Sequence, residues 1–258
     1  MHDLPLTLVG GYLGSGKTTW INARLAAADG VRFAVMVNDF GDLNVDAALI
    51  ADRGAQTVEL SNGCVCCSIS GDMAAAAESV AARADRLDWV LLEASGVADL
   101  TRLKQQVAHW PGFHLEQALT FADATRIRTL VHDKFVGAHV RTQLREADLV
   151  RLTHLDCMDD AARIATEHWL TELRTTRDAP RAEVPEFKGE RIDGTRFAHR
   201  AELEHWLAAQ AETTQRIKGF VRFADDSVHL VQWRPGACDI TPEAGQRPLQ
   251  LVRITLAD

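Results

Sequence analysis

The segment from Gly11 to Thr18 constrains the fold of this chain more than any other. Its sequence, Gly-Tyr-Leu-Gly-Ser-Gly-Lys-Thr, matches the phosphate-binding loop pattern G-x-x-x-x-G-K-[ST]. An apolar, partly β-branched run at residues 6–9 predicts a buried strand before the loop, and residues 19–28 predict a helix after it. This strand-to-helix turn is the context that the pattern requires, so the sequence predicts a P-loop fold.

The residue types in the loop fit the binding of a phosphate chain. Glycines allow backbone N–H groups to approach the anion closely, and the following helix presents its positive dipole end. We expect Lys17 to contact the β- and γ-phosphates and the hydroxyl of Thr18 to bind Mg²⁺. The predicted nucleotide-contacting residues here are Gly11, Gly14, Ser15, Gly16, Lys17, Thr18 and Thr19.

Short apolar runs alternate with helical stretches along most of the chain, a pattern typical of a parallel α/β sheet flanked by helices. Further strands are predicted at residues 33–37, 57–60, 89–92, 119–122 and 149–152, and further helices at 71–85, 99–110, 137–147 and 159–175. After residue 211 the character changes to strand-like runs at 216–223, 228–233 and 249–254, with a Pro/Gly-containing loop at 235–248. We therefore expect a nucleotide-binding domain at 1–211 and a small, mainly β (α+β) domain at 212–258.

Composition excludes several classes of function. Hydrophobic residues make up 47% and charged residues 25% of the 258 residues, which is typical of an ordinary globular protein. The net charge of −8 argues against binding nucleic acid. We expect no association with a membrane, because no apolar run is long enough to span one and no secretory signal is visible. The predicted location is the cytoplasm, where clustered thiols bind metal or do redox work.

Acidic residues follow two of the predicted strands. Glu93 comes directly after the strand at 89–92, where metal and phosphate sites of such sheets gather. We expect Glu93 to hold Mg²⁺ or its water and the N–H of Gly96 to contact the γ-phosphate. Asp39 and Asp46 are the candidates for orienting the attacking water or completing the Mg²⁺ shell, with a solvated loop acid as the alternative.

The cysteines give a second chemical signal. Cys64, Cys66 and Cys67 stand together in a Gly-containing turn, and thiolates are soft ligands suited to Zn²⁺, Cu⁺ or Co²⁺. Three thiolates leave a tetrahedral site one ligand short, which suits a metal that must leave again. Asp39 or Asp42 is a candidate fourth ligand, while buried structural cysteines or a redox disulfide are the alternatives. The isolated Cys157 and Cys238 are interpreted as packing residues.

A base-recognition element is expected after the strand at 149–152. Guanine is usually recognised by Asn-Lys-x-Asp, and this chain has Thr153-His154-Leu155-Asp156. Asp156 keeps the carboxylate that accepts from guanine, and His154 replaces lysine as the group that stacks on the base. Thr153 makes fewer hydrogen bonds than asparagine would. The element favours GTP over ATP.

Together these motifs resemble the CobW-type P-loop GTPases, a family of metal chaperones and metal-enzyme activators. The resemblance rests on the segments at 11–19, 38–41, 62–67, 93–96 and 216–219, which occur in the family's order and spacing. It implies GTP hydrolysis and a thiolate site that delivers Zn²⁺, Co²⁺ or iron (Fe²⁺) to a client metalloprotein. The resemblance also suggests a homodimer, which the sequence itself does not show.

The chain departs from that family in three places. Asp39 stands where the family usually has Glu, the base element lacks Asn-Lys, and the C-terminal domain is short. The leading hypothesis is a nucleotide-gated metal carrier with Lys17, Asp39 and Glu93 as catalytic residues. The alternatives are a metal-sensing module with little turnover and a small-molecule kinase that uses the same loop.

Overall fold

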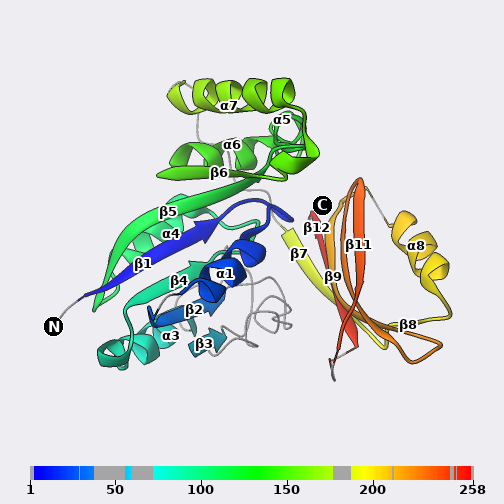
Figure 1. Cartoon of the computed structure of the whole chain (residues 1–258), viewed down its shortest axis with the longest axis horizontal. Helices are drawn as coiled ribbons and strands as arrows, with labels where there is room; N and C mark the ends of the chain where they lie inside the picture. The colour runs from blue at the N-terminus through cyan, green and yellow to red at the C-terminus, as the bar shows by residue number, and fades with distance from the viewer. Residues whose placement is uncertain are drawn as a thin grey trace.

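Figure 1 shows the computed structural model of the chain, which describes residues 3–28, 30–37, 56–59, 72–176, 187–210, 212–244, 247 and 249–256. Within these residues, the first sheet has the strand order β3-β2-β4-β1-β5-β6, and every neighbouring pair is parallel. Its strands are β1 (Leu4–Gly10), β2 (Phe33–Val37), β3 (Gln56–Glu59), β4 (Trp89–Glu93), β5 (Phe113–Asp123) and β6 (Leu149–Thr153).

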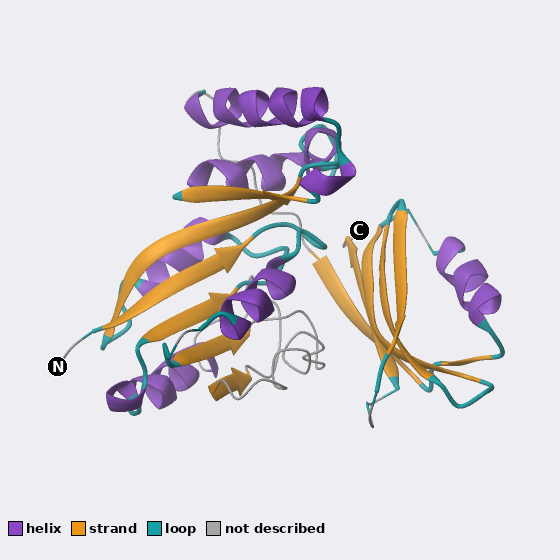
Figure 2. Cartoon of the chain, viewed as in Figure 1, coloured by secondary structure: helices purple, strands orange, loops and turns teal. Residues whose placement is uncertain are grey.

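Helices cover both faces of this sheet, as Figure 2 shows. The helical elements are α1 (Lys17–Ala26), α3 (Asp72–Ala81), η2 (Ala84–Arg86), α4 (Leu100–Val107), α5 (Ile127–Leu130), α6 (Gly137–Glu146), η3 (Leu155–Cys157) and α7 (Asp160–Thr175). Alternate strand residues enter two separate cores. Leu8 and Leu92 pack with α3 and α4, whereas Val35 and Leu91 pack with Ile21 of α1. β1, β2 and β4 are therefore apolar on both faces, as buried parallel strands should be.

The second sheet is mainly antiparallel, with the order β11-β10-β9-β12-β7 and with β8 paired in parallel to β9. Its elements are β7 (Phe187–Asp193), β8 (Arg196–Phe197), α8 (Arg200–Ala208), β9 (Thr214–Phe223), β10 (Val228–Arg234), β11 (Ala237–Pro242) and β12 (Gln250–Leu256). Figure 1 shows this sheet beside the first, with α8 on its far side.

The strand period of two divides the second sheet into two faces. On β9, Ile217 and Val221 pack with α8, while Phe220 joins a cluster that includes Leu13 of the phosphate loop. Leu230 of β10 lies in this second cluster too. One face of the sheet therefore builds its own core, and the other is directed at the first sheet.

The predicted fold class, a parallel sheet flanked by helices with a second, mainly β domain, is confirmed. Elements of the second sheet begin before residue 212, since β7 pairs with β12 and β8 with β9. We propose that the second domain begins between Thr176 and Phe187 rather than near residue 212. The predicted loop at 235–248 contains the strand β11, so that part of the expectation was wrong.

Two further findings bear on the expectations. Cys157 and Cys238 are exposed, so their interpretation as packing residues was wrong. Cys157 lies in the short η3 at the surface, and Cys238 lies on β11 at the edge of its sheet. In the part of the chain that the structure describes, no helix is both long and apolar enough to cross a membrane.

Candidate functional site

The phosphate loop joins β1 to α1 and has the geometry that its glycines predict. Gly16 precedes α1 with φ of 89°, a left-handed conformation that glycine adopts readily. Gly11 has φ of 127°, and a Cβ there would lie 2.2 Å from the carbonyl oxygen of Phe121 on β5. The ammonium of Lys17 is buried and donates to the carbonyl oxygen of Gly11 over 2.8 Å. The loop thus holds a cation beside the first turn of α1, where helix N–H groups favour an anion.

Thr18, in the first turn of α1, meets Glu93 at the end of β4. The hydroxyl of Thr18 donates to Oε1 of Glu93 over 2.9 Å, and Glu93 is buried. A hydroxyl and a carboxylate are the hard oxygen ligands that suit Mg²⁺. The side chains of Thr18 and Glu93 therefore fit the Mg²⁺ ion that accompanies a nucleoside triphosphate.

The loop after β4 packs directly against the phosphate loop. A Cβ on Gly96 would lie 2.8 Å from the backbone nitrogen of Leu13, so only glycine fits this approach. Gln143 of α6 donates through Nε2 to the carbonyl oxygens of Gly96 at 3.2 Å and Ala98 at 3.1 Å. Gln143 thereby fixes the backbone of the segment that is predicted to face the γ-phosphate.

Thr153 and His154 of the expected base-recognition element reach the phosphate loop. The hydroxyl of Thr153 lies 3.1 Å from the carbonyl oxygen of Ser15, and His154 takes a left-handed conformation with φ of 56°. Asp156 is exposed in η3 and is not among the residues that line the pocket described below. The structure thus brings Thr153 and His154 to the loop, whereas recognition of guanine by Asp156 stays a prediction.

Asp123, at the end of β5, connects three parts of the site. Its Oδ2 accepts a hydrogen bond of 2.6 Å from Nη1 of Arg234 on β10, and its Oδ1 lies 3.5 Å from Nδ1 of His154. Burial raises the pKa of Asp123, but hydrogen bonds from Thr125 and Arg234 outweigh burial, so the pKa lies below its ordinary value. Asp123 is therefore an anion that holds Arg234 at the phosphate loop.

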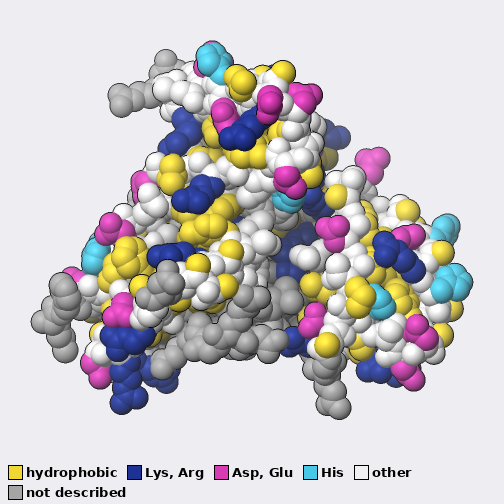
Figure 3. All heavy atoms as spheres, in the orientation of Figure 1, with side chains coloured by type: hydrophobic (Ala, Val, Ile, Leu, Met, Phe, Trp, Pro, Cys, Tyr) yellow, Lys and Arg dark blue, Asp and Glu magenta, His cyan; other side chains and the backbone are white. Residues whose placement is uncertain are grey.

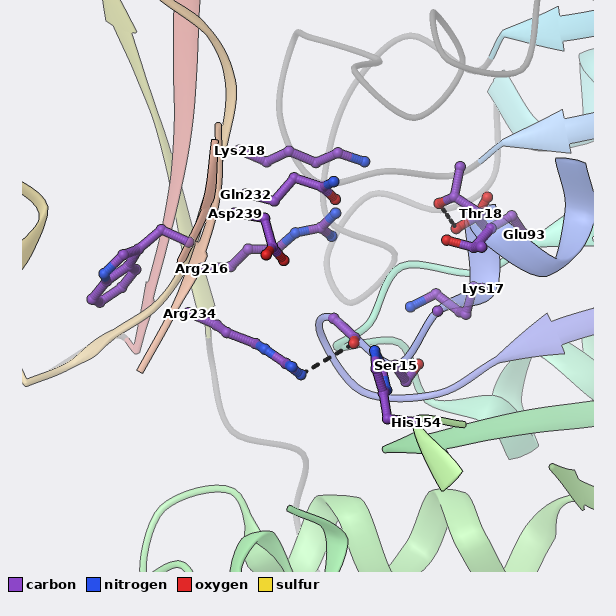
Figure 4. A pocket seen from close by; sticks show the side chains of 14 residues that line it. Ser15, Lys17, Thr18, Glu93, His154, Arg216, Lys218, Gln232, Arg234 and Asp239 are labelled. Carbon is purple, nitrogen blue, oxygen red and sulfur yellow. Dashed lines mark hydrogen bonds between the residues drawn. The ribbon is translucent and has the colours of Figure 1, made fainter. Parts of the chain in front are cut away.

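A pocket lies between the two sheets. One wall comes from the phosphate loop and α1, and the other from β9, β10 and β11, as Figure 4 shows. The lining residues are Gly14, Ser15, Gly16, Lys17, Thr18, Thr19, Glu93, His154, Arg216, Lys218, Gln232, Trp233, Arg234 and Asp239. In the space-filling view of Figure 3, Lys and Arg side chains are visible in the hollow between the two units. The second sheet therefore supplies six of these fourteen lining residues and three of the four Lys and Arg side chains among them.

Other predicted site residues lie outside the described part of the chain. These are Asp39, Asp42, Asp46, Cys64, Cys66 and Cys67. Among the described residues, no group of three or more His, Cys, Asp or Glu side chains is placed to hold a metal. The thiolate site thus stays a prediction from the sequence.

Sequence reasoning missed Gln143, Asp123 and Arg234. No sequence motif around Gln143 indicates a role in the site, because this residue lies within an amphipathic helix. Asp123 ends an apolar strand, the same signal that singled out Glu93. Arg234 continues the alternation of β10, in which Gln232 shares its face.

The parallel sheet, the glycine-rich loop before α1 and the Thr18–Glu93 pair define a P-loop nucleotide-binding protein. Residues 5–180 match the CobW/HypB/UreG nucleotide-binding domain, and residues 191–257 match the cobalamin synthesis protein CobW C-terminal domain. The chain therefore belongs to the CobW/HypB/UreG family.

Curated relatives of this chain have names that refer to zinc. It is 31% identical over 185 residues to a zinc chaperone CobW of Sinorhizobium sp, covering 60% of this chain and 52% of that protein. It is 30% identical over 172 residues to the zinc chaperone YjiA of Escherichia coli, covering 64% and 53%. The crystal structure of Zn(II)-bound YjiA GTPase from E. coli has 16% identity and a TM-score of 0.46, with 99% and 94% coverage. The chain spans about half the length of the curated relatives it matches.

Proposed function

We propose that this chain is a GTP-hydrolysing metal chaperone in which the nucleotide gates a thiolate metal site. The metal that it carries is Zn²⁺, with Co²⁺ and Fe²⁺ as the alternatives. The chaperone transfers this metal to a client metalloprotein. The observation that supports this most is the hydrogen bond between Thr18 and Glu93, which joins the phosphate loop to the end of β4. The names of the zinc chaperone relatives support the choice of metal.

Each residue of the nucleotide site has a proposed role. Lys17 neutralises the β- and γ-phosphates, and Thr18 and Glu93 hold Mg²⁺, which supplies electrostatic stabilisation of the charge on the phosphates. The N–H of Gly96 contacts the γ-phosphate, and Asp39 orients the attacking water. The bonds from Gln143 to this loop support the role of Gly96, because they fix its backbone next to Leu13.

The topology of the sheet supports coupling between nucleotide and metal. Glu93 is in register with Val37 at the end of β2, and Val37 is in register with Glu59 at the end of β3. The chain that carries Asp39 follows β2, and the chain that carries the three cysteines follows β3. β2 and β3 therefore end at the same edge of the sheet as Glu93, which supports a proposed effect of the γ-phosphate on the residues that follow these strands in the sequence.

A metal titration tests the proposal. Reduced, metal-free protein is titrated anaerobically with Zn²⁺ and with Co²⁺, without nucleotide and with Mg-GDP, a non-hydrolysable GTP analogue or the matching ATP analogue. We expect the GTP analogue alone to tighten metal binding several-fold and the Co²⁺ complex to absorb in the visible region as a thiolate complex. By linkage, the metal must tighten binding of the GTP analogue by the same factor. Equal metal affinity in all four states would refute gating.

The cysteines are tested with a matched pair of variants. Cys66→Ala should weaken Zn²⁺ binding at least tenfold and leave nucleotide affinity in the absence of metal unchanged. Cys238→Ala removes an exposed thiol on β11 and should change neither. If Cys66→Ala binds Zn²⁺ as tightly as the parent, the thiolate site is assigned to the wrong residues. A GTPase assay with and without Zn²⁺ separates a chaperone with turnover from a sensor that binds both ligands and hydrolyses almost nothing.

A further inference from the structure

The second sheet presents a cationic surface to the phosphate loop. Strand alternation places Arg216 and Lys218 of β9 and Gln232 and Arg234 of β10 on one face, with Gln232 in register with Lys218. Figure 4 shows these side chains directed across the pocket toward Lys17 and Thr18, with the carboxylate of Asp239 among them. A chain of net charge −8 has thus concentrated several cations around one pocket. Such a wall is suited to a polyanion that touches both sheets.

Among these side chains, Arg234 forms a hydrogen bond directly with the phosphate loop. Its Nη1 donates to the carbonyl oxygen of Gly14 over 3.2 Å as well as to Asp123, and its side chain is only 17% exposed. A Cβ on Gly14 would lie 3.0 Å from Cδ of Arg234, so the loop and the arginine are in van der Waals contact. The guanidinium is therefore already positioned beside the loop that binds phosphate.

The hydrogen bonds of Arg234 leave most of its fork available. Both bonds that it makes to described residues use Nη1, whereas a guanidinium has five N–H groups in one plane. A planar fork matches phosphate oxygens with two parallel hydrogen bonds, which a lysine cannot do. Asp123 holds one side of the fork and leaves the other for an anion in the pocket.

We propose that Arg234 is a phosphate-binding residue that the second sheet supplies to the phosphate loop of the same chain, and that it favours nucleoside triphosphate over diphosphate. This inference rests on the proposed nucleotide site. The extra phosphate of the triphosphate spans the pocket from Lys17 to Arg234. Binding of the triphosphate thereby ties the two sheets together, whereas the diphosphate leaves that contact unmade.

The test compares the affinities of Mg-GDP and a non-hydrolysable GTP analogue for the full chain by calorimetry. In Arg234→Gln, affinity for the GTP analogue should fall about ten- to a hundredfold, the usual worth of a hydrogen bond between charged groups. Affinity for GDP should change less than about threefold. Arg234→Lys keeps the charge but loses the planar fork. Its affinity for the GTP analogue should lie between that of the parent and that of Arg234→Gln.

Gln215→Ala is the matched control. Gln215 on β9 accepts a 2.9 Å hydrogen bond from the hydroxyl of Tyr12 and does not line the pocket. The Gln215→Ala variant therefore removes a contact between the second sheet and Tyr12 of the phosphate loop, but it removes no side chain that lines the pocket. We expect its ratio of GTP-analogue to GDP affinity to equal that of the parent.

Two results would overturn the inference. If Arg234→Gln and Arg234→Lys lose affinity for both nucleotides equally, or for neither, Arg234 is only a structural contact between the sheets. A parent chain that binds no nucleotide would overturn the proposed function as well, so the two failures are distinguishable. A thermal melt of each variant shows that it is folded.

Discussion

Replacing His139 should make the chain more resistant to acid. His139 lies on α6, is 1% exposed, and packs edge-on against Phe187 of β7 with ring centroids 6.4 Å apart. Burial lowers the pKa of His139 to about 4, against smaller opposing effects of Asp99 and the backbone of Gly96. The imidazole is therefore neutral in the folded chain at pH values where an unfolded chain would protonate it.

The sign and size follow from the two pKa values. The unfolded chain takes up a proton near pH 6.5 and the folded chain only near pH 4, so stability is lost as the pH falls between them. Between pH 7.5 and pH 5.0 this linkage removes about 2 kcal/mol from the free energy of unfolding. His139→Leu removes the linkage. At pH 7.5 it should change stability by less than about 1.5 kcal/mol, because the two side chains have similar volumes.

The assay is urea unfolding followed by tryptophan fluorescence at pH 7.5 and at pH 5.0, with a chelator present. The parent should lose about 2 kcal/mol more than His139→Leu between the two pH values. His132→Leu, which replaces an exposed histidine in the turn after α5, should behave as the parent does. Equal losses in the parent and in His139→Leu would refute the reasoning, because they would show that His139 is protonated equally in both states.

Three further variants test the site and the core. Gly96→Ala should lower affinity for a GTP analogue at least tenfold, measured by calorimetry, because its Cβ would lie 2.8 Å from the nitrogen of Leu13; unchanged affinity would separate this loop from the nucleotide. Lys17→Ala should lower affinity for GDP and the GTP analogue at least tenfold in the same assay, and tight binding by this variant would remove the phosphate loop from the proposal. Leu103→Ala on α4, at 0% exposure, should lower the free energy of unfolding by about 2–5 kcal/mol in urea, and a loss below about 1 kcal/mol would contradict its place in the core. Gln105→Ala, exposed on the same helix, is its control and should stay within about 0.5 kcal/mol of the parent.

Local pattern was enough to predict the parallel sheet. β1, β2 and β4 are short, mostly apolar runs. Asp99 and Asp159 accept hydrogen bonds from the first turns of α4 and α7, as helix caps do. The strands of the second sheet were harder to predict from the sequence, because β7 has few apolar residues and β11 is flanked by proline and glycine. Their strand character comes from pairing with distant strands, which propensity does not report.

Some residues of the site could likewise be predicted from the sequence, and others only from the structure. The phosphate loop, Thr18 and Glu93 are recognisable because spacing along the chain fixes their chemistry. The pair of Asp123 and Arg234 joins residues 111 positions apart, and no local pattern announces such a contact. The sequence shows that Arg234 shares a strand face with Gln232, but only the packing of the two sheets shows that this face meets the phosphate loop.

The two-sided character of β9 restricts how this protein can tolerate insertions and deletions. Ile217 and Val221 face α8, while Arg216 and Lys218 face the pocket. Because strand side chains alternate, one residue gained or lost before Arg216 would exchange the two sets along the whole strand. Charged side chains would then enter the core beneath α8, and apolar ones would line the pocket. Insertion or deletion of one residue at this point would therefore damage both folding and ligand binding. A substitution at one position of β9 would damage either the core or the pocket, because its side chain faces only one of them.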